Sequence, residues 1–219
     1  EDKSKLIMMG TMTQFKRVLK KLKAQPFDLE TLAEEVRRSL KNYRYPASLP
    51  WGGKECQIMG ILNVTPDSFY DGGKFDVKEK AVGRAIEMVE YGADIIDVGG
   101  ESTRPGSERI SLEKEKERVI PVIKEIKNKI DVKISIDTYK PEIAEAAVEA
   151  GADIVNDVFG LRKEGMIQKI AELDVPIIIM HMQGEPKNMQ DNPVYEDVIT
   201  DISSFFIQQT EKAIEVGVK

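Results

Sequence analysis

Five short apolar runs, each ended by a polar residue, limit the folds open to this chain more than any other feature. The runs, with the polar residues that end them, are Ile58–Leu62 with Asn63, Ile95–Ile96 with Asp97, Val132–Ile136 with Asp137, Ile154–Val155 with Asn156, and Val175–Met180 with His181. Segments with helical spacing of apolar residues lie between them. Continuous apolar runs are typical of parallel strands that are buried on both faces. The pattern therefore predicts a parallel α/β fold, whose active site lies at the carboxyl ends of the strands.

Composition excludes several other classes of protein. Of the 219 residues, 41% are apolar and 32% are charged, as in globular proteins that fold in water. No apolar stretch approaches the roughly 18 residues of a membrane span, so no membrane partner is expected. The net charge is −6 and the one basic cluster, Lys16–Lys23, has helical spacing, so nucleic acid is not an expected partner. Cys56 is the single cysteine, which rules out an intrachain disulfide and indicates a cytoplasmic protein.

The sequence divides into two predicted parts. Residues 1–50 are predicted to be a helical N-terminal extension and linker. Helical spacing predicts one helix over 13–22 and a second after Asp28, and the prolines within 45–50 indicate an extended linker. Residues 51–219 hold all five apolar runs and are predicted to be the first part of a strand–helix domain.

Capping residues predict helix boundaries in this second part. Gly92 is a candidate left-handed cap after the helix that follows the first strand. Ser111 is a candidate N-cap for the next helix, and Pro141 suits the first turn of the one after it. Pro121 lies inside the helix after Ser111, which it is expected to kink or break.

An internal repeat bears on the extent of the domain. Residues 89–94 (VEYGAD) precede the second apolar run, 148–153 (VEAGAD) precede the fourth, and 214–219 (IEVGVK) have the same form. We therefore expect a sixth strand to follow, and the chain to be the N-terminal portion of a longer polypeptide. Five strand–helix units do not close an eight-stranded barrel. A doubly wound open sheet is the alternative, but no GxGxxG fingerprint or P-loop supports it.

Two glycine-rich loops follow the first two apolar runs. Asn63 opens the first loop, and its side-chain oxygen is suited to a hard cation such as Mg²⁺. Asp67 and Asp71 in the same loop are candidates for binding metal or handling a proton, although a turn-rich loop is the alternative. In the second loop, Thr103 and Arg104 offer donors to an anion, with an exposed surface loop as the alternative.

The later strand ends carry a carboxylate and an amide. Asp137 accepts two hydrogen bonds and Asn156 both donates and accepts, which suits a flat heterocycle; polar closure of a barrel rim is the alternative. His181 is the single histidine and is expected to have a structural role. One histidine and one cysteine argue against a zinc site, and no nucleophilic triad is present.

Taken in this order, the five segments resemble dihydropteroate synthases of folate biosynthesis. The resemblance runs from about Cys56 to the last residue, and it is carried by Asn63–Gly73, Gly100–Gly106, Ser135–Thr138, Asn156–Asp157 and Met180–Met182. It implies a (β/α)8 TIM barrel of which about five βα units are present. It implies a transferase that condenses a dihydropterin pyrophosphate with p-aminobenzoate, uses Mg²⁺ and is a target of sulfonamides. A homodimer of the full-length protein is a further implication.

The resemblance also implies roles for particular residues. The implied pterin-binding residues are Asp137, Asn156, Val158 and Met180. The implied p-aminobenzoate and pyrophosphate loops contribute Thr65, Phe69, Thr103, Arg104 and Pro105. Asn63 is the implied Mg²⁺ ligand, and Asp71 and Arg104 are the implied catalytic residues.

One departure from the family pattern leaves other functions open. Members carry an Asp-Pro-Gly strand end, a Ser-Arg-Lys-Ser segment and an Arg-x-His segment, and none of these occurs here. We therefore expect residues 1–219 alone to be inactive. The alternatives are a corrinoid-dependent methyltetrahydrofolate methyltransferase, which needs no p-aminobenzoate loop, and a catalytically incomplete barrel fragment that serves another protein.

Overall fold

The computed structural model describes residues 12–25, 29–42, 52, 56–65, 74–102 and 109–218. The chain divides into two compact units, Glu1–Glu55 and Cys56–Lys219, and each is described by itself. Among the described residues, no helix is both long enough and apolar enough to cross a lipid bilayer.

The first unit contains two amphipathic helices, α1 (Met12–Lys23) and α2 (Glu30–Asn42). In α1, Phe15, Val18, Leu19 and Leu22 recur at helical spacing and are half-buried, whereas the polar side chains between them are exposed. Lys23 at the end of α1 forms an ion pair with Glu34 of α2, with 3.2 Å between Nζ and Oε1. Both helices confirm the prediction for these ranges, whereas the predicted cap Asp28 and the linker 45–50 lie outside the described residues.

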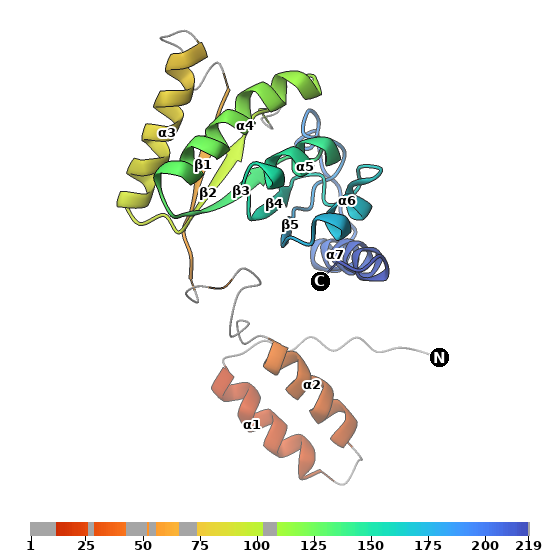
Figure 1. The fold of residues 1–219 in the computed structure, drawn as a ribbon. Coiled ribbons are helices and arrows are strands. Elements are labelled where there is room, and N and C mark those ends of the chain that lie inside the picture. The colour runs from red at the N-terminus through yellow and green to blue at the C-terminus, as the bar shows by residue number, and fades with distance from the viewer. Residues whose placement is uncertain are drawn as a thin grey trace. The chain divides into compact units, whose positions relative to one another are not determined.

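The second unit alternates strands and helices (Figure 1). Its elements are β1 (Met59–Asn63), α3 (Lys74–Glu90), β2 (Ile95–Gly99), α4 (Leu112–Lys129), β3 (Lys133–Asp137), α5 (Pro141–Glu149), β4 (Ile154–Asp157), α6 (Met166–Leu173), β5 (Ile177–Ile179) and α7 (Val198–Glu215). The five strands are parallel and lie in the order in which they occur in the chain. A doubly wound sheet reverses its strand order at a switch point, and this sheet has no such point. The topology is therefore that of a wall of a (β/α) barrel, as predicted.

The hydrophobic core of this unit lies between the sheet and the helices. Alternate strand residues face the helices, because successive side chains of a strand point to opposite sides. The strand residues in this core are Leu62, Ile96, Val98, Ile134, Ile136 and Val155. They meet helix residues that include Ala81, Val82, Ala85, Val119, Val122, Ile123 and Ile126. The opposite face of the sheet carries the polar strand-end residues together with the apolar side chains of Ile61, Ile95 and Ile154.

The repeated segments end their helices in the same way. Gly92, Gly151 and Gly217 have φ angles of 102°, 114° and 93°, a conformation that only glycine adopts readily. The first two lead directly into β2 and β4. The repeat therefore reflects one way of reversing the chain from a helix into the next strand.

The predicted helix boundaries at Ser111 and Pro141 are also confirmed, whereas the break predicted as one outcome of Pro121 does not occur. Ser111 caps α4, since its Oγ accepts from the backbone N–H of Lys114 at 3.3 Å, and Pro141 begins α5. Pro121 does not break α4, which continues to Lys129. Its ring lies on the exposed side of the helix, where water can hydrate the carbonyl that loses its helical donor. The buried residues of the other face keep the helix on the sheet.

Truncation of one core residue should test this packing. Ile134 on β3 is fully buried. In the natural full-length protein, Ile134→Ala is expected to lower the free energy of unfolding by about 2–5 kcal/mol, because it leaves a cavity. Urea denaturation measures this value. The control is Gly83→Ala in α3, where a new Cβ meets no atom within 4 Å. That variant is expected to be more stable by about 0.5–1 kcal/mol, and a loss of stability there would contradict the described helix.

Candidate active site

Four residues at the carboxyl ends of β1–β4 form one row across the sheet. The strand register pairs Asn63 with Gly99, Gly99 with Asp137, and Asp137 with Asn156. Asp97 lies two residues before Gly99 and faces the same side. This is the side of the sheet opposite to the core under the helices. Residues that are far apart in the sequence therefore meet at one edge, as the apolar runs predict.

A hydrogen bond joins Asn156 of this row to Asp97 of β2. The side-chain amide Nδ2 of Asn156 donates to Oδ2 of Asp97 at 3.0 Å. Asp97 is only 5% exposed, and its Oδ1 and the Oδ1 of Asp137 are buried without a hydrogen-bond partner among the described residues. Buried acceptors are normally satisfied, and each one left without a donor is unfavourable. The row thus presents acceptors to a ligand that brings N–H groups.

Burial controls the ionisation of these carboxyl groups. Burial raises the pKa of Asp97, and the side chains of Ser135 and Asn156 beside its carboxyl group offset this only in part. The pKa of Asp137 is raised to about 8, first by burial and then by the negative charge of Asp97. Without a ligand, Asp137 is therefore mostly protonated at neutral pH. A ligand with N–H donors or positive charge would favour the ionised form.

Gly99 keeps the centre of the row open. A Cβ at this position would lie 3.3 Å from Oδ1 of Asn63 and 3.5 Å from Oδ2 of Asp137. A side chain here would fill the space between these two oxygen atoms. Hard cations such as Mg²⁺ prefer oxygen ligands and often keep several waters and a substrate phosphate in their coordination shell. Asn63 is exposed and fits such a cation as a single protein ligand. The described residues contain no cluster of three or more acidic, histidine or cysteine ligands.

A second, small apolar cluster lies beyond the strand ends. It contains Tyr139, Val158, Phe159 and Met182, with Met180 packed against it. The rings of Tyr139 and Phe159 stack with their centroids 4.4 Å apart. Val158 and Met180 therefore have packing partners within the protein, and Met182 is buried as a core residue. Contact of Val158 and Met180 with a ligand remains a prediction.

Several predicted site residues are not part of this description. Phe69, Asp71, Thr103, Arg104 and Pro105 lie outside the described residues, as does Asp67. Thr65 is described and is buried, two residues after the end of β1. His181 packs against aromatic rings, with its centroid 4.9 Å from that of Phe205, which agrees with a structural role.

The sequence alone misses three features of the site. The space at Gly99 and the bond from Asn156 to Asp97 both depend on strand register. The third feature is a buried cluster of Glu101, Glu115 and Lys140, whose charged groups make direct contacts. In the sequence, Lys140 stands out only as a lysine immediately before Pro141. Nothing near it in the sequence indicates that Glu101 and Glu115 are its partners.

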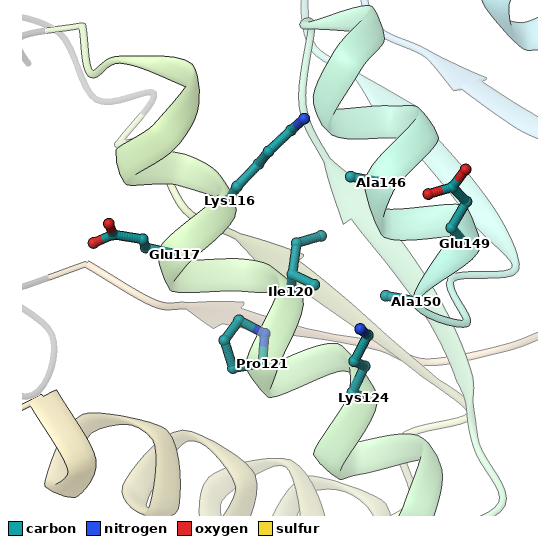
Figure 2. A pocket seen from close by; sticks show the side chains of 8 residues that line it. All are labelled: Lys116, Glu117, Ile120, Pro121, Lys124, Ala146, Glu149 and Ala150. Atoms are coloured by element: carbon teal, nitrogen blue, oxygen red, sulfur yellow. The ribbon is translucent and has the colours of Figure 1, made fainter.

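A groove on the outer surface is separate from this site. It has a volume of about 550 Å³ and runs between α4 and α5 (Figure 2). Figure 2 shows Lys116, Ile120 and Lys124 of α4 on one side, and Ala146 and Glu149 of α5 on the other. The groove belongs to the helix layer, whereas Asp137 and Asn156 lie on the opposite face of the sheet.

Comparisons with known proteins agree on one family. The model of the family described as "Pterin binding enzyme" matches residues 59–219. The dihydropteroate synthase of Escherichia coli K12 is 47% identical over 161 residues, which are 74% of this chain and 57% of that protein. A probable bifunctional folylpolyglutamate synthase/dihydropteroate synthase of Halobacterium salinarum is 50% identical over 182 residues, 82% of this chain and 22% of that protein.

Solved structures give the same result. The dihydropteroate synthase of Yersinia pestis, in a complex with a sulfonamide drug, has a TM-score of 0.69 at 44% identity, over 74% of this chain and 59% of that one. The Burkholderia cenocepacia enzyme, complexed with 7,8-dihydropteroate, has a TM-score of 0.67 at 39% identity, over 77% and 56% of the two chains. The chain therefore spans little more than half the length of these two solved structures and of the Escherichia coli protein. The structural likeness confirms the predicted barrel fold over that part.

The raised pKa of Asp137 predicts how stability depends on pH. Between the ordinary Asp pKa of about 4 and the raised value of about 8, the folded protein holds a proton that the unfolded chain lacks. Stability therefore falls as pH rises through this range. Asp137→Asn cannot lose a proton in this range, so its stability should not show this fall. The Tm of Asp137→Asn minus the Tm of the parent protein should therefore be near zero below about pH 4 and largest above about pH 8.

Thermal unfolding of both proteins across this range measures the difference. The control is Asp131→Asn, which removes one negative charge from an exposed position. A difference in Tm for Asp137→Asn that does not vary with pH would contradict the assigned burial of the Asp137 carboxyl group.

Proposed function

Because this chain belongs to the pterin-binding enzyme family, we propose that it is the pterin-binding part of a dihydropteroate synthase. The reaction joins p-aminobenzoate to a dihydropterin pyrophosphate, and it gives dihydropteroate and pyrophosphate. The observation that carries this proposal is the row of Asp137 and Asn156, with buried acceptors beside a space that Gly99 leaves open. The family relation and the sequence identity to dihydropteroate synthases support it.

The row suits the amino-pyrimidine edge of a pterin. That edge carries N–H donors and ring acceptors. Asp137 accepts hydrogen bonds through its carboxyl oxygens, and Asn156 is held in place by Asp97 so that its remaining side-chain oxygen is left for a donor. The N–H groups of the ligand replace the missing partners of the buried carboxyl oxygens. Val158 and Met180 supply apolar contact to the ring.

The reaction needs charge stabilisation and orientation more than a strong nucleophile. The bond between the pterin methylene carbon and the pyrophosphate oxygen breaks, and its electron pair leaves with the pyrophosphate. The amine nitrogen of p-aminobenzoate forms the new bond and then loses a proton. Asp71 stabilises the positive charge that develops on the pterin, and Arg104 stabilises the leaving pyrophosphate.

The remaining proposed contacts surround the leaving group and the second substrate. Asn63 would hold Mg²⁺, which when bound supplies positive charge to the pyrophosphate oxygens. The residues proposed for the p-aminobenzoate and pyrophosphate loops are Thr65, Phe69, Thr103, Arg104 and Pro105. Loops that exclude water would also protect the reactive pterin from hydrolysis.

The proposal extends to the whole protein. Residues 51–219 are the first part of the barrel and residues 1–50 are an extension outside it. Activity is assigned to the natural full-length protein, and residues 1–219 alone are expected to be inactive. The partners are small molecules, the compartment is the cytoplasm, and a homodimer is the expected assembly.

An assay of the full-length protein tests the proposed reaction. With dihydropterin pyrophosphate, Mg²⁺ and p-aminobenzoate, it is expected to release pyrophosphate and form dihydropteroate, and a sulfonamide should compete with p-aminobenzoate. Transfer of a methyl group from methyltetrahydrofolate, with no use of p-aminobenzoate, would instead identify a corrinoid-dependent methyltransferase. Absence of both activities would leave a barrel that serves another protein.

A single substitution tests the role of Asp71. Asp71→Asn keeps the size of the side chain and removes its charge, so it should lower kcat by about a hundredfold or more, as loss of one stabilising group does. The affinity for the pterin substrate should change much less, since Asp137 and Asn156 are intact. Steady-state kinetics with each substrate varied in turn separate kcat from KM. Asp131→Asn is the matched control, because it removes one negative charge from an exposed position. A kcat of Asp71→Asn equal to that of the parent protein would reject the role.

A further inference from the structure

A buried ionic cluster lies beside the candidate site and has no part in the chemistry proposed above. The Lys140 ammonium group donates to Oε2 of Glu101 at 2.6 Å and to Oε2 of Glu115 at 2.5 Å. The hydroxyl groups of Tyr139 and Thr138 donate to the other oxygens of Glu101 and Glu115, each at 2.9 Å. The side chains of Lys140 and Glu101 are 10% exposed, and that of Glu115 is 1% exposed.

Stability alone does not account for these buried charges. Removing ions from water is expensive, and apolar residues of similar size often stabilise a protein as well or better. Burial raises the pKa of Glu115 even though Lys140 is in contact with it, so the ionised form of Glu115 remains unfavourable. A cluster of this kind fixes particular groups in particular places more effectively than it stabilises the fold.

The groups that the cluster fixes are the two ends of the connection between β2 and α4. The backbone carbonyl of Ile110 accepts from Nζ of Lys140 at 2.9 Å, and the backbone N–H of Ile110 donates to Oε2 of Glu101 at 3.2 Å. Glu101 lies just after β2, and Ile110 lies just before the cap of α4. One ammonium group therefore contacts both ends of this connection.

The cluster is also attached to the strand that carries Asp137. Lys140 lies immediately before α5, three residues after Asp137. The backbone N–H of Lys140 donates to Oγ1 of Thr138 at 3.2 Å, and this hydroxyl group in turn donates to Glu115. The ends of the β2–α4 connection are thus set relative to the end of β3.

We infer that Lys140 is a positioning residue for the second substrate. It holds Glu101 and Ile110 at a fixed place beside the end of β3, and thereby sets where the β2–α4 connection begins and ends relative to the pterin-binding row. Its effect on p-aminobenzoate rests on the proposed function, because Thr103 and Arg104 belong to this connection.

Lys127 provides a matched control with the same chemistry. Its Nζ donates to the carbonyl of Val132 at 3.1 Å and to Oδ2 of Asp153 at 2.8 Å. It therefore joins one carboxylate to a backbone carbonyl, whereas Lys140 joins two carboxylates to one. Val132 and Asp153 precede β3 and β4, at the amino ends of the strands, where residues of a barrel contribute to stability rather than to catalysis.

The experiment compares Lys140→Met with Lys127→Met in the full-length protein. For Lys140→Met, KM for p-aminobenzoate should rise by about tenfold or more, with the Kd for the pterin substrate changed by less than about threefold. The backbone amide of Ile110 should exchange hydrogen at least about tenfold faster. Lys127→Met should lower Tm and leave both KM values and the exchange at Ile110 unchanged.

A double variant separates positioning from charge compensation. Lys140→Met leaves two buried carboxylates uncompensated, and adding Glu115→Gln neutralises one of them. If Lys140 acts by position, Lys140→Met/Glu115→Gln recovers Tm but keeps the raised KM and the fast exchange, because the carbonyl of Ile110 still lacks its donor. Should Lys140→Met fail to fold, the double variant alone provides the comparison with the parent.

The outcomes distinguish this inference from the proposed function. Wild-type KM and wild-type exchange at Ile110 in the double variant would overturn the positioning role. If the parent protein makes no dihydropteroate, the proposed function fails. In that case the exchange at Ile110 still decides whether Lys140 holds the connection, and exchange as slow as in the parent overturns the inference.

Discussion

The register of the parallel strands is the constraint on which the rest of this structure depends. It pairs Asn63, Gly99, Asp137 and Asn156 across four strands, so that residues from distant parts of the chain form one row. A shift of one residue in any strand would turn its polar group toward the helices and an apolar one toward the site. The core under the helices prevents such a shift, because it already holds the alternate residues of the same strands.

Buried charge is handled differently at the two ends of the sheet. At the carboxyl ends, Asp137 has a raised pKa and a buried oxygen without a protein partner, which leaves it suited to a ligand. Nearby, Lys140 satisfies two carboxylates and a carbonyl at once. At the amino ends, Lys127 of α4 and Asp153 before β4 form a simpler pair that is only partly buried. The carboxyl ends of the strands, which carry the candidate site, are thus where carboxyl groups are buried at a cost in free energy.

Much of the local structure was predictable from single segments. The cap at Ser111, the turn at Pro141 and the glycine at 92 each act through their own backbone, so a short stretch of sequence is enough to identify them. Pro121 is the exception. Its effect on α4 depends on which side of the helix faces the solvent, and the buried residues of the other face decide that.

The sequence by itself determined the alternation of strands and helices, the buried faces, and the polar residues that end the strands. These follow from hydrophobic periodicity and from capping, which act over a few residues. Only the tertiary structure decided that Asn156 donates to Asp97, 59 positions away, and that Lys140 joins Glu101 and Glu115, 39 and 25 positions away. The pKa of Asp137 belongs with these, because it is set by burial and by charges on neighbouring strands rather than by the residues next to it.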